Sequence, residues 1–402
     1  MEVGETWNES VAYRDPLTGR RVRRLTTRGR VNQTPTYHTN SGFTRDGRRL
    51  VLVSVREKAT WVLLADVQSG QLKAVYRAPG IGDRSYIHRR MALDFPDVDG
   101  GGICGNRLCI APGLQMAVFA CGQQLLAVDV DTLESRTLIE DCGEEWIFGA
   151  PCVSPDERHV AITLSSAHPE ILDGRRPTKR YLDFPDHCLR IVRVPMAGGA
   201  AEVLYERSPA QSAHSAWRPT DASILYFDLD LPPRYWCGSD GATPRIWLLD
   251  VATGGARPLK ERYPGAFQVH QAWLWDGTAM AYHGPLADGG VYVGIADVDG
   301  STRWEREFPG ATHYGHLTPD ARRPALIMDG DFSRDRLQWL YYDEEEPRAG
   351  PRLEPVCLHS TQWGSIPGQY SHPHPLTDSS GRWISFTSAR DGRSDVYVVE
   401  IE

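Results

Sequence analysis

The sequence lacks the features that mark membrane, secreted or nucleic-acid-binding proteins. No apolar run is long enough to span a membrane, and the first residues, MEVGETWNESVAYRDP, have neither the basic start nor the apolar stretch of a signal peptide. We therefore expect a cytoplasmic protein with no membrane partner. No basic patch or run of lysine and arginine argues for nucleic acid, and the formal net charge is −8, so we also expect no nucleic-acid partner.

The chain also lacks the cysteine spacing of a common zinc site. Eight cysteines are present, but none forms a Cys-x-x-Cys pair. That absence disfavours a structural zinc site, and a disulfide between Cys104 and Cys109 is likewise the less favoured alternative. We expect free, buried thiols, as in a reducing compartment.

Helical periodicity is almost absent, and a β-rich repeat takes its place. Each copy has a turn with Asp or Gly, two apolar strands and a short further strand, as in FTRDGRRLVLVSV followed by TWVLLADVQSGQLKAVY. Repeats of this size and strand content are typical of propeller blades. A pair of β-sandwiches is the alternative, but regular copies rather than two groups of strands disfavour it.

We interpret the chain as one all-β domain, residues 1–402, that forms a seven-bladed β-propeller. The approximate blades are 37–77, 110–140, 150–206, 214–260, 270–307, 313–353 and 369–402, with 20–26 added to the last. The last copy stops after its third strand. The N-terminal segment from Arg20 to Leu25 should supply the missing outer strand and close the ring, which leaves no long open edge. Two gaps, 78–108 and 168–186, are expected to be surface loops, and such loops are often functional lids.

The histidines follow the repeat. Of 13 histidines, seven precede the turn that opens a blade in five of the copies: His38, His214, His270, His313, His316, His372 and His374. In a propeller the first strand of each blade lines the central channel, so these residues should converge at the channel mouth. Taken singly, His38 or His214 is more often a hydrogen-bonded packing residue than a ligand.

The strongest local pattern is the segment from Gln369 to Pro375, QYSHPHP. In extended chain, residues two apart project to the same face, so His372 and His374 should point together. The prolines suit a segment outside the sheet. A third imidazole from His316 and a carbonyl oxygen from Gln369 would complete a nitrogen and oxygen ligand set. Such a set suits Mn, Fe, Ni or Zn.

These residues resemble those of a known family. The stretch CLHSTQWGSIPGQYSHPHP is similar to the C-terminal signature of the oligogalacturonate lyases. Further similarity covers nearly the whole chain in blade order: YRDPLTGRRVRRLT, FTRDGRRL, EEWIFGAPCVSPD, RPTDASILYF, RIWLLDVATG, VHQAWLWDGTAMAY and HLTPDARRPALIMDG. The C-terminal motif is specific, whereas the blade matches alone would be generic.

The resemblance implies a fold, an activity and a set of site residues. It implies a seven-bladed propeller that degrades pectin fragments inside the cell, with Mn²⁺ on its axis. The metal ligands fall on His316, Gln369, His372 and His374, the general base on His270, and an arginine that assists the reaction on Arg245. The chain departs from the family at Asp228–Pro232, where the family has His-Glu-Gly-Pro, and 78–108 matches poorly. These departures bear on the exact sugar.

The function hypothesis is a metal-dependent lyase that cleaves an acidic oligosaccharide, a short oligogalacturonide, by β-elimination. Neutral imidazole is a suitable base near pH 7, although His270 could instead support or pack against the site. Arg245 could instead form a surface salt bridge. His214, His38 and His313 are candidate sugar contacts. Four tryptophans could stack on sugar, but packing is the more common role: Trp217, Trp273, Trp275 and Trp363.

Two other functions stay open from the sequence alone. One is a lyase for another uronate chain, such as a glucuronan or ulvan fragment. The other is a non-catalytic propeller that binds a protein or envelope component, since fold alone does not decide function. That scaffold would tolerate substitution of His372 and His374 and would hold no tightly bound metal. The sequence does not specify an oligomeric state.

Overall fold

Every regular element that the structure describes is a β-strand. The computed structural model describes residues 1–35, 41–78, 107–143, 145–166, 187–212, 214–231, 244–265, 267–311, 315–342, 351–366 and 369–401. Within these ranges there is no α-helix, and therefore no helix that could cross a membrane. Most of the predicted loop 78–108 and all of the predicted loop 168–186 lie outside the described residues.

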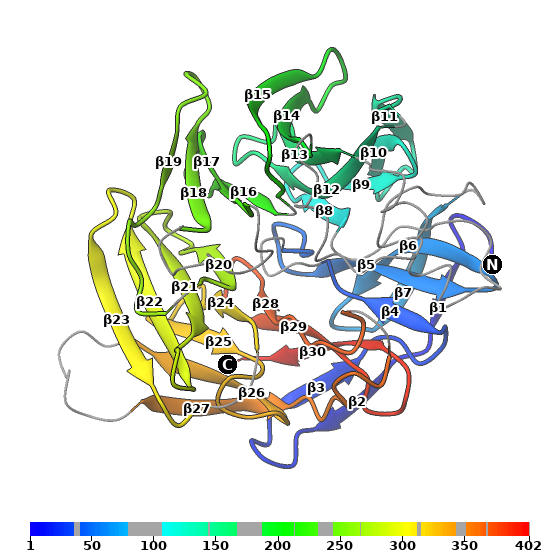
Figure 1. Cartoon of the computed structure of the whole chain (residues 1–402). Helices are drawn as coiled ribbons and strands as arrows, with labels where there is room; N and C mark the ends of the chain where they lie inside the picture. The colour runs from blue at the N-terminus through cyan, green and yellow to red at the C-terminus, as the bar shows by residue number, and fades with distance from the viewer. Residues whose placement is uncertain are drawn as a thin grey trace.

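The strands form seven antiparallel sheets around a ring (Figure 1). Blade 1 contains β1 (Thr6–Asn8), β4 (Val31–Gln33), β5 (Arg49–Arg56), β6 (Ala59–Asp66) and β7 (Gln71–Arg77). Blade 2 contains β8 (Leu108–Ala111), β9 (Met116–Cys121), β10 (Gln124–Asp129) and β11 (Ser135–Ile139). Blade 3 contains β12 (Trp146–Val153), β13 (His159–Ser166), β14 (Leu189–Pro195) and β15 (Glu202–Arg207).

The remaining four sheets follow the same order. Blade 4 contains β16 (Ser215–Arg218), β17 (Asp221–Asp228), β18 (Ile246–Asp250) and β19 (Ala256–Pro258). Blade 5 contains β20 (His270–Trp273), β21 (Ala279–Pro285), β22 (Val291–Asp297) and β23 (Thr302–Phe308). Blade 6 contains β24 (Leu317–Pro319), β25 (Ala325–Met328), β26 (Arg336–Tyr341) and β27 (Arg352–Leu358). Blade 7 contains β2 (Val11–Arg14), β3 (Arg21–Arg24), β28 (Leu376–Thr377), β29 (Trp383–Ser388) and β30 (Asp395–Glu400). The expected seven-bladed propeller is confirmed.

The hydrophobic core is divided among the spaces between neighbouring blades. Seven clusters of buried apolar side chains each join two adjacent blades. In β5, Leu50 and Leu52 pack toward blade 7 while Val51 and Val53 pack toward blade 2. Alternate residues of a strand face opposite sides of its sheet, so a blade packed on both sides needs a continuous apolar strand. This explains the unbroken apolar runs in the sequence.

The N-terminal segment closes the ring, as predicted, and it also adds one outermost strand to blade 7 and one to blade 1. β3 pairs with β30, so an N-terminal strand follows the three C-terminal strands of blade 7. β2 then adds a fifth strand to that blade, and β1 adds a fifth strand to blade 1 by pairing with β7. The two outermost additions were not predicted from the sequence.

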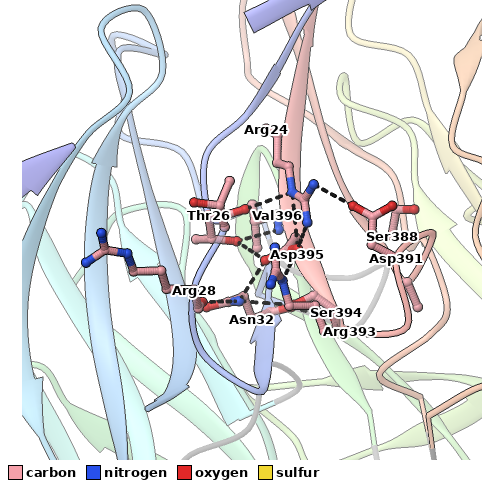
Figure 2. Close-up of polar contacts among 12 residues, drawn as sticks. Arg24, Thr26, Arg28, Asn32, Ser388, Asp391, Arg393, Ser394, Asp395 and Val396 are labelled. Atoms are coloured by element: carbon pink, nitrogen blue, oxygen red, sulfur yellow. Dashed lines mark hydrogen bonds and ion pairs between the residues drawn. The ribbon is translucent and has the colours of Figure 1, made fainter. Parts of the chain in front are cut away.

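A buried carboxylate joins the two sides of this closure (Figure 2). Asp395, at the start of β30, is fully buried. Its Oδ2 accepts a hydrogen bond from Nε of Arg24 at 3.1 Å, and its Oδ1 accepts from Thr26 Oγ1 at 3.1 Å and Asn32 Nδ2 at 3.0 Å. Arg24 also donates to the exposed Asp391 at 2.6 Å. These contacts link the N-terminal strand, blade 1 and blade 7.

The described cysteines are free thiols, and most are buried. They are Cys109, Cys121, Cys142, Cys152, Cys188 and Cys357. Burial raises the pKa of Cys121 to about 11 and that of Cys142 to about 12, which makes both thiols poor nucleophiles. Cys104 and Cys237 lie outside the described residues.

Candidate metal centre and active site

The histidines predicted from the repeat lie where the innermost strands begin. His214 directly precedes β16, His270 is the first residue of β20, and His316 directly precedes β24. His374 lies two residues before β28. Because these innermost strands begin at the same end of the ring, residues from four blades meet there. His38 and His313 lie outside the described residues.

Three imidazoles form a compact cluster. The potential ligand atoms of His316, His372 and His374 all lie within 4.8 Å of one another. The ring centroids of His316 and His374 are 4.0 Å apart, and those of His316 and His372 are 5.4 Å apart. His316 and His374 are fully buried, and His372 is half-buried. Two blades therefore supply nitrogen donors to one point.

The backbone brings His374 into this cluster in a different way from the predicted one. The extended segment expected from His-Pro-His is wrong at His374, whose φ is +46°, in the left-handed region. Two hydrogen bonds hold this bend: Thr387 N–H donates to Pro373 O at 2.8 Å, and His374 N–H donates to Asp329 Oδ2 at 3.0 Å. The two rings still converge, with centroids 5.7 Å apart.

Asp329, just after β25, orients two of the clustered histidines. Its Oδ1 accepts the backbone N–H of His316 at 2.6 Å, and its Oδ2 accepts from His316 Nδ1 at 3.0 Å. Asp329 thereby fixes the tautomer of His316, because the proton must sit on Nδ1. The lone pair then sits on Nε2, which suits that nitrogen to a metal ion. Burial raises the pKa of Asp329, whereas the backbone N–H groups of His316 and His374 oppose that rise.

Gln369 offers an oxygen at the same loop. Its side-chain Oε1 is buried and has no hydrogen-bond partner among the described residues. A buried carbonyl oxygen without a donor is costly unless another group, such as a cation, contacts it. The neighbouring Tyr370 packs with Val31 and Val55 of blade 1, which anchors this loop. Three imidazole nitrogens and one amide oxygen form a donor set that fits a divalent first-row metal.

The environment keeps the clustered imidazoles neutral. Burial, followed by the neighbouring imidazoles, lowers the pKa of His316 and His374 well below the usual value. Burial also lowers the pKa of His372. A neutral imidazole is the form that can donate a lone pair to a metal ion. The cluster is therefore suited to metal binding at neutral pH.

His270 lies beside the cluster. Its side chain is fully buried, and its ring centroid is 4.4 Å from that of His316. Nδ1 of His270 is 2.8 Å from Nε2 of His283, on the adjacent strand β21. Nδ1 of His283 is in turn 2.8 Å from Oδ2 of Asp331, although the ring N–H is poorly aligned with that oxygen.

Arg245 is buried rather than at the surface, so the surface salt bridge considered for it is wrong. Its guanidinium contacts Asp228 and Asp230, the second through Nε and Oδ1 at 2.8 Å. Burial raises the pKa of Asp230. At Asp228 burial acts the same way, but Arg245 and His214 lower the pKa overall. Nη1 of Arg245 also donates to the carbonyl of Val269 at 2.8 Å, directly before His270.

A repeated pairing underlies the site. In blades 4, 5 and 6, the histidine at the start of the first strand contacts a polar residue at the end of the second strand. The three pairs are His214 with Asp228, His270 with His283, and His316 with Asp329. The partner residues were missed from the sequence. A signal exists in retrospect, because LYFD, MAYH and LIMD each place a polar residue at the end of an apolar strand.

The tryptophans divide between packing and the site. Trp217 and Trp273 are buried in the interfaces of blade 4. Trp275 is half-buried, and its indole N–H donates to Pro319 O at 3.1 Å. Trp363 is also half-buried, and its ring centroid is 4.9 Å from that of His372. Trp363 is therefore the tryptophan of the four that adjoins the histidine cluster.

Comparison with known proteins gives one family. A sequence model described as oligogalacturonate lyase matches residues 115–402. The oligogalacturonate lyase of Dickeya dadantii is 24% identical over 406 residues, covering 97% of this chain and 95% of that protein. The oligogalacturonide lyase of Pectobacterium atrosepticum is 25% identical over 292 residues, covering 69% of this chain and 72% of that protein.

Solved structures agree in fold. An oligogalacturonate lyase in complex with manganese has a TM-score of 0.77 at 20% identity, covering 100% of this chain and 99% of that chain. An oligogalacturonate lyase from Vibrio parahaemolyticus has a TM-score of 0.74 at 20% identity, with the same coverage. At this identity, the structural similarity establishes the propeller fold.

Proposed function

Because this chain belongs to the oligogalacturonate lyase family and is therefore a polysaccharide lyase, we propose that it cleaves short oligogalacturonides by metal-dependent β-elimination. The observation that carries the proposal is the cluster of His316, His372 and His374, whose ligand atoms lie within 4.8 Å of one another, with the ring of His270 beside it. Few structural roles require three neutral imidazoles at one buried point with a fourth histidine ring beside them.

The metal would be held by His316, His372, His374 and the amide oxygen of Gln369. The fit rests on the donor chemistry and on the buried Oε1 of Gln369, which has no hydrogen-bond partner among the described residues. We propose Mn²⁺, because a relative of the same fold is an oligogalacturonate lyase in complex with manganese. A bound divalent cation supplies a Lewis acid that neutralises the uronate carboxylate and stabilises the negative charge that develops on it.

His270 is the proposed base. It would take the proton from C5 of the uronate. The electron pair of that C–H bond would form the C4–C5 double bond, and the glycosidic C4–O bond would break. The leaving oxygen would take a proton from water to become a hydroxyl, and His270 would later release its proton to water. Neutral imidazole can accept this proton near pH 7. The burial of His270 excludes water that would otherwise compete for the lone pair.

Arg245 would assist the reaction by positioning the backbone next to His270. Two carboxylates compensate its charge, and its Nη1 holds the carbonyl of Val269 next to the base. His214, oriented by Asp228, is the proposed contact for sugar hydroxyls. Trp363 offers a half-buried aromatic face beside His372 on which a sugar ring could stack.

The direct test is to incubate the purified protein with Mn²⁺ and digalacturonate and to follow the ultraviolet absorbance of the unsaturated product. A panel with glucuronan and ulvan fragments tests the substrate class. We expect His270→Ala to lose elimination activity and to retain bound metal. His159→Ala is the matched control and should keep full activity. His159 is the first residue of β13, the second strand of blade 3, and therefore lies at the end of its blade away from the site. Full activity in His270→Ala would remove His270 from the role of base.

A further inference from the structure

We propose that His283 and Asp331 position the base His270 and set its tautomer, so that Nε2 is the nitrogen that accepts the substrate proton. The inference deepens the proposed function and rests on it. The three side chains form a line of contacts across two blades. His270 and His283 come from β20 and β21 of blade 5, and Asp331 follows β25 of blade 6.

All three side chains are shielded from water. His270 is fully buried, and His283 and Asp331 are 2% and 1% exposed. Both links of the line measure 2.8 Å between heavy atoms. The first link is a hydrogen bond, whereas the second is a close contact in which the ring N–H is poorly aligned with the carboxylate. In so buried a position, two lone pairs that face each other are strongly unfavourable.

The carboxylate assigns the protons along the line. A lone pair on Nδ1 of His283 would repel Asp331 Oδ2 at 2.8 Å, so Nδ1 must carry the proton. Nε2 of His283 then has the lone pair, and it accepts the Nδ1–H of His270. His270 consequently has its own lone pair on Nε2.

The same line stabilises the state that forms when His270 takes the proton. The new imidazolium keeps its Nδ1–H bond to His283, and the charge of Asp331 lies one ring further along. A buried charge needs such compensation because water cannot supply it. No proton needs to move beyond His270.

The position of His283 supports an orienting role over simple packing. It occupies the second-strand position that Asp228 and Asp329 occupy in the neighbouring blades, where each contacts a first-strand histidine. In blade 5 that position holds an imidazole, and the carboxylate comes from blade 6 instead. The base is thereby oriented by an imidazole ring, and the carboxylate lies one ring further away.

The test compares kcat, KM and bound Mn²⁺ in Asp331→Asn, His283→Leu and His283→Gln. We expect Asp331→Asn and His283→Leu to lower kcat about 10- to 100-fold, as for other residues that orient a functional histidine, with KM and bound Mn²⁺ unchanged. His283→Gln should recover much of the loss, because its amide can accept from His270 and donate to Asp331. A purely structural role would not predict this rescue.

Asp320→Asn is the matched control. It makes the same substitution in the same blade, in the turn between β24 and β25, where Asp320 accepts the indole N–H of Trp339 at 2.8 Å. We expect it to leave kcat unchanged even where it lowers thermal stability.

The outcomes separate the two proposals. If His270→Ala keeps full activity, the base assignment fails and the orienting line fails with it. If His270→Ala is inactive while Asp331→Asn and His283→Leu keep the wild-type kcat, only the orienting line is overturned. A fall in kcat that follows loss of bound Mn²⁺ in every variant would also overturn it, because the effect would then act through the metal centre.

Discussion

At the scale of single residues, one carboxylate connects the two halves of the metal cluster. Asp329 binds His316 through both the backbone and the ring, and it also binds the backbone of His374. His359 in turn holds the backbone of Asp329. Thr361 N–H donates to Nδ1 of His359 at 3.1 Å, so the ring proton of His359 sits on Nε2, which donates to Asp329 O at 3.1 Å. The geometry of the ligands thus depends on residues that would not touch the metal.

Asp329→Asn should weaken metal binding about 10- to 100-fold, because the amide can no longer accept from all three N–H groups. Titration calorimetry of the metal-free protein with Mn²⁺ measures the change. Asp378→Asn is the control, since Asp378 is equally buried but accepts from Trp383 N–H in the turn between β28 and β29. Equal Mn²⁺ affinity in Asp329→Asn and wild type would contradict the prediction.

The pH dependence of stability should reveal the buried neutral His359. Burial lowers its pKa from 6.5 to about 4. The unfolded chain therefore binds the proton more readily, so the stabilisation is complete above pH 6.5 and is lost as the pH falls toward 4 and below. The full loss corresponds to about 3 kcal/mol. Urea unfolding of the metal-free protein at several pH values in this interval should show a shallower pH slope in His359→Gln than in wild type. Identical slopes in the two proteins would exclude His359 as a source of the pH dependence of stability.

At the scale of strands, the register between the first and second strands of a blade determines which side chains meet at the site. The histidine at or directly before the start of a first strand lies opposite a residue at or near the end of the second strand, so one alignment produces three orienting pairs. The turns between these strands lie at the other end of each blade and can vary without moving the pair. A strand shifted by one residue would turn the partner to the opposite face of the sheet.

The closure of the ring offers a direct test at this scale. Asp395→Ala should destabilise the protein by about 3 kcal/mol, because it leaves Arg24 and several buried donors without their acceptor. Asp391→Ala removes the other carboxylate that Arg24 contacts, but this one is exposed, so the loss should stay below about 1 kcal/mol. Urea unfolding measures both values. Equal losses would show that Asp395 has no special role in the closure.

The sequence predicted the blades and the histidines because both depend on a repeat. Apolar strands and turns recur along the chain, and the position of His270 or His316 within a copy places it at the channel. The partners could not be predicted in the same way, since Asp331 meets His283 only after blades 5 and 6 pack together. The turn at His374 was also missed, because a short sequence does not show which N–H groups will hold the backbone.

At the scale of the whole molecule, the residues that stabilise the fold and the residues of the candidate active site lie in different places. The seven interblade clusters contain the hydrophobic core, whereas the histidine cluster occupies the hub. Residues 1–207 contribute strands to four blades, but none of their described residues joins the three-histidine cluster.

Chelation should therefore abolish turnover and leave the ring folded. Far-ultraviolet circular dichroism should keep its β-sheet signal after metal removal. The melting temperature should fall, because a metal that binds only the folded state stabilises it by about 3 kcal/mol at a hundredfold excess over Kd. Activity that persists after verified metal removal, or a collapse of the β-sheet signal, would contradict this separation.

The left-handed backbone at His374 has a consequence for how the centre selects its ion. A non-glycine residue in that region costs about 1 to 2 kcal/mol, and here two main-chain contacts maintain it before any ion arrives. A prearranged loop has little left to adjust, so the choice among cations falls to their intrinsic preference for nitrogen. Competition calorimetry should rank them as simple imidazole complexes do, with Mn²⁺ weakest and Cu²⁺ strongest. The identity of the working ion would then reflect supply in the cell rather than discrimination by the protein.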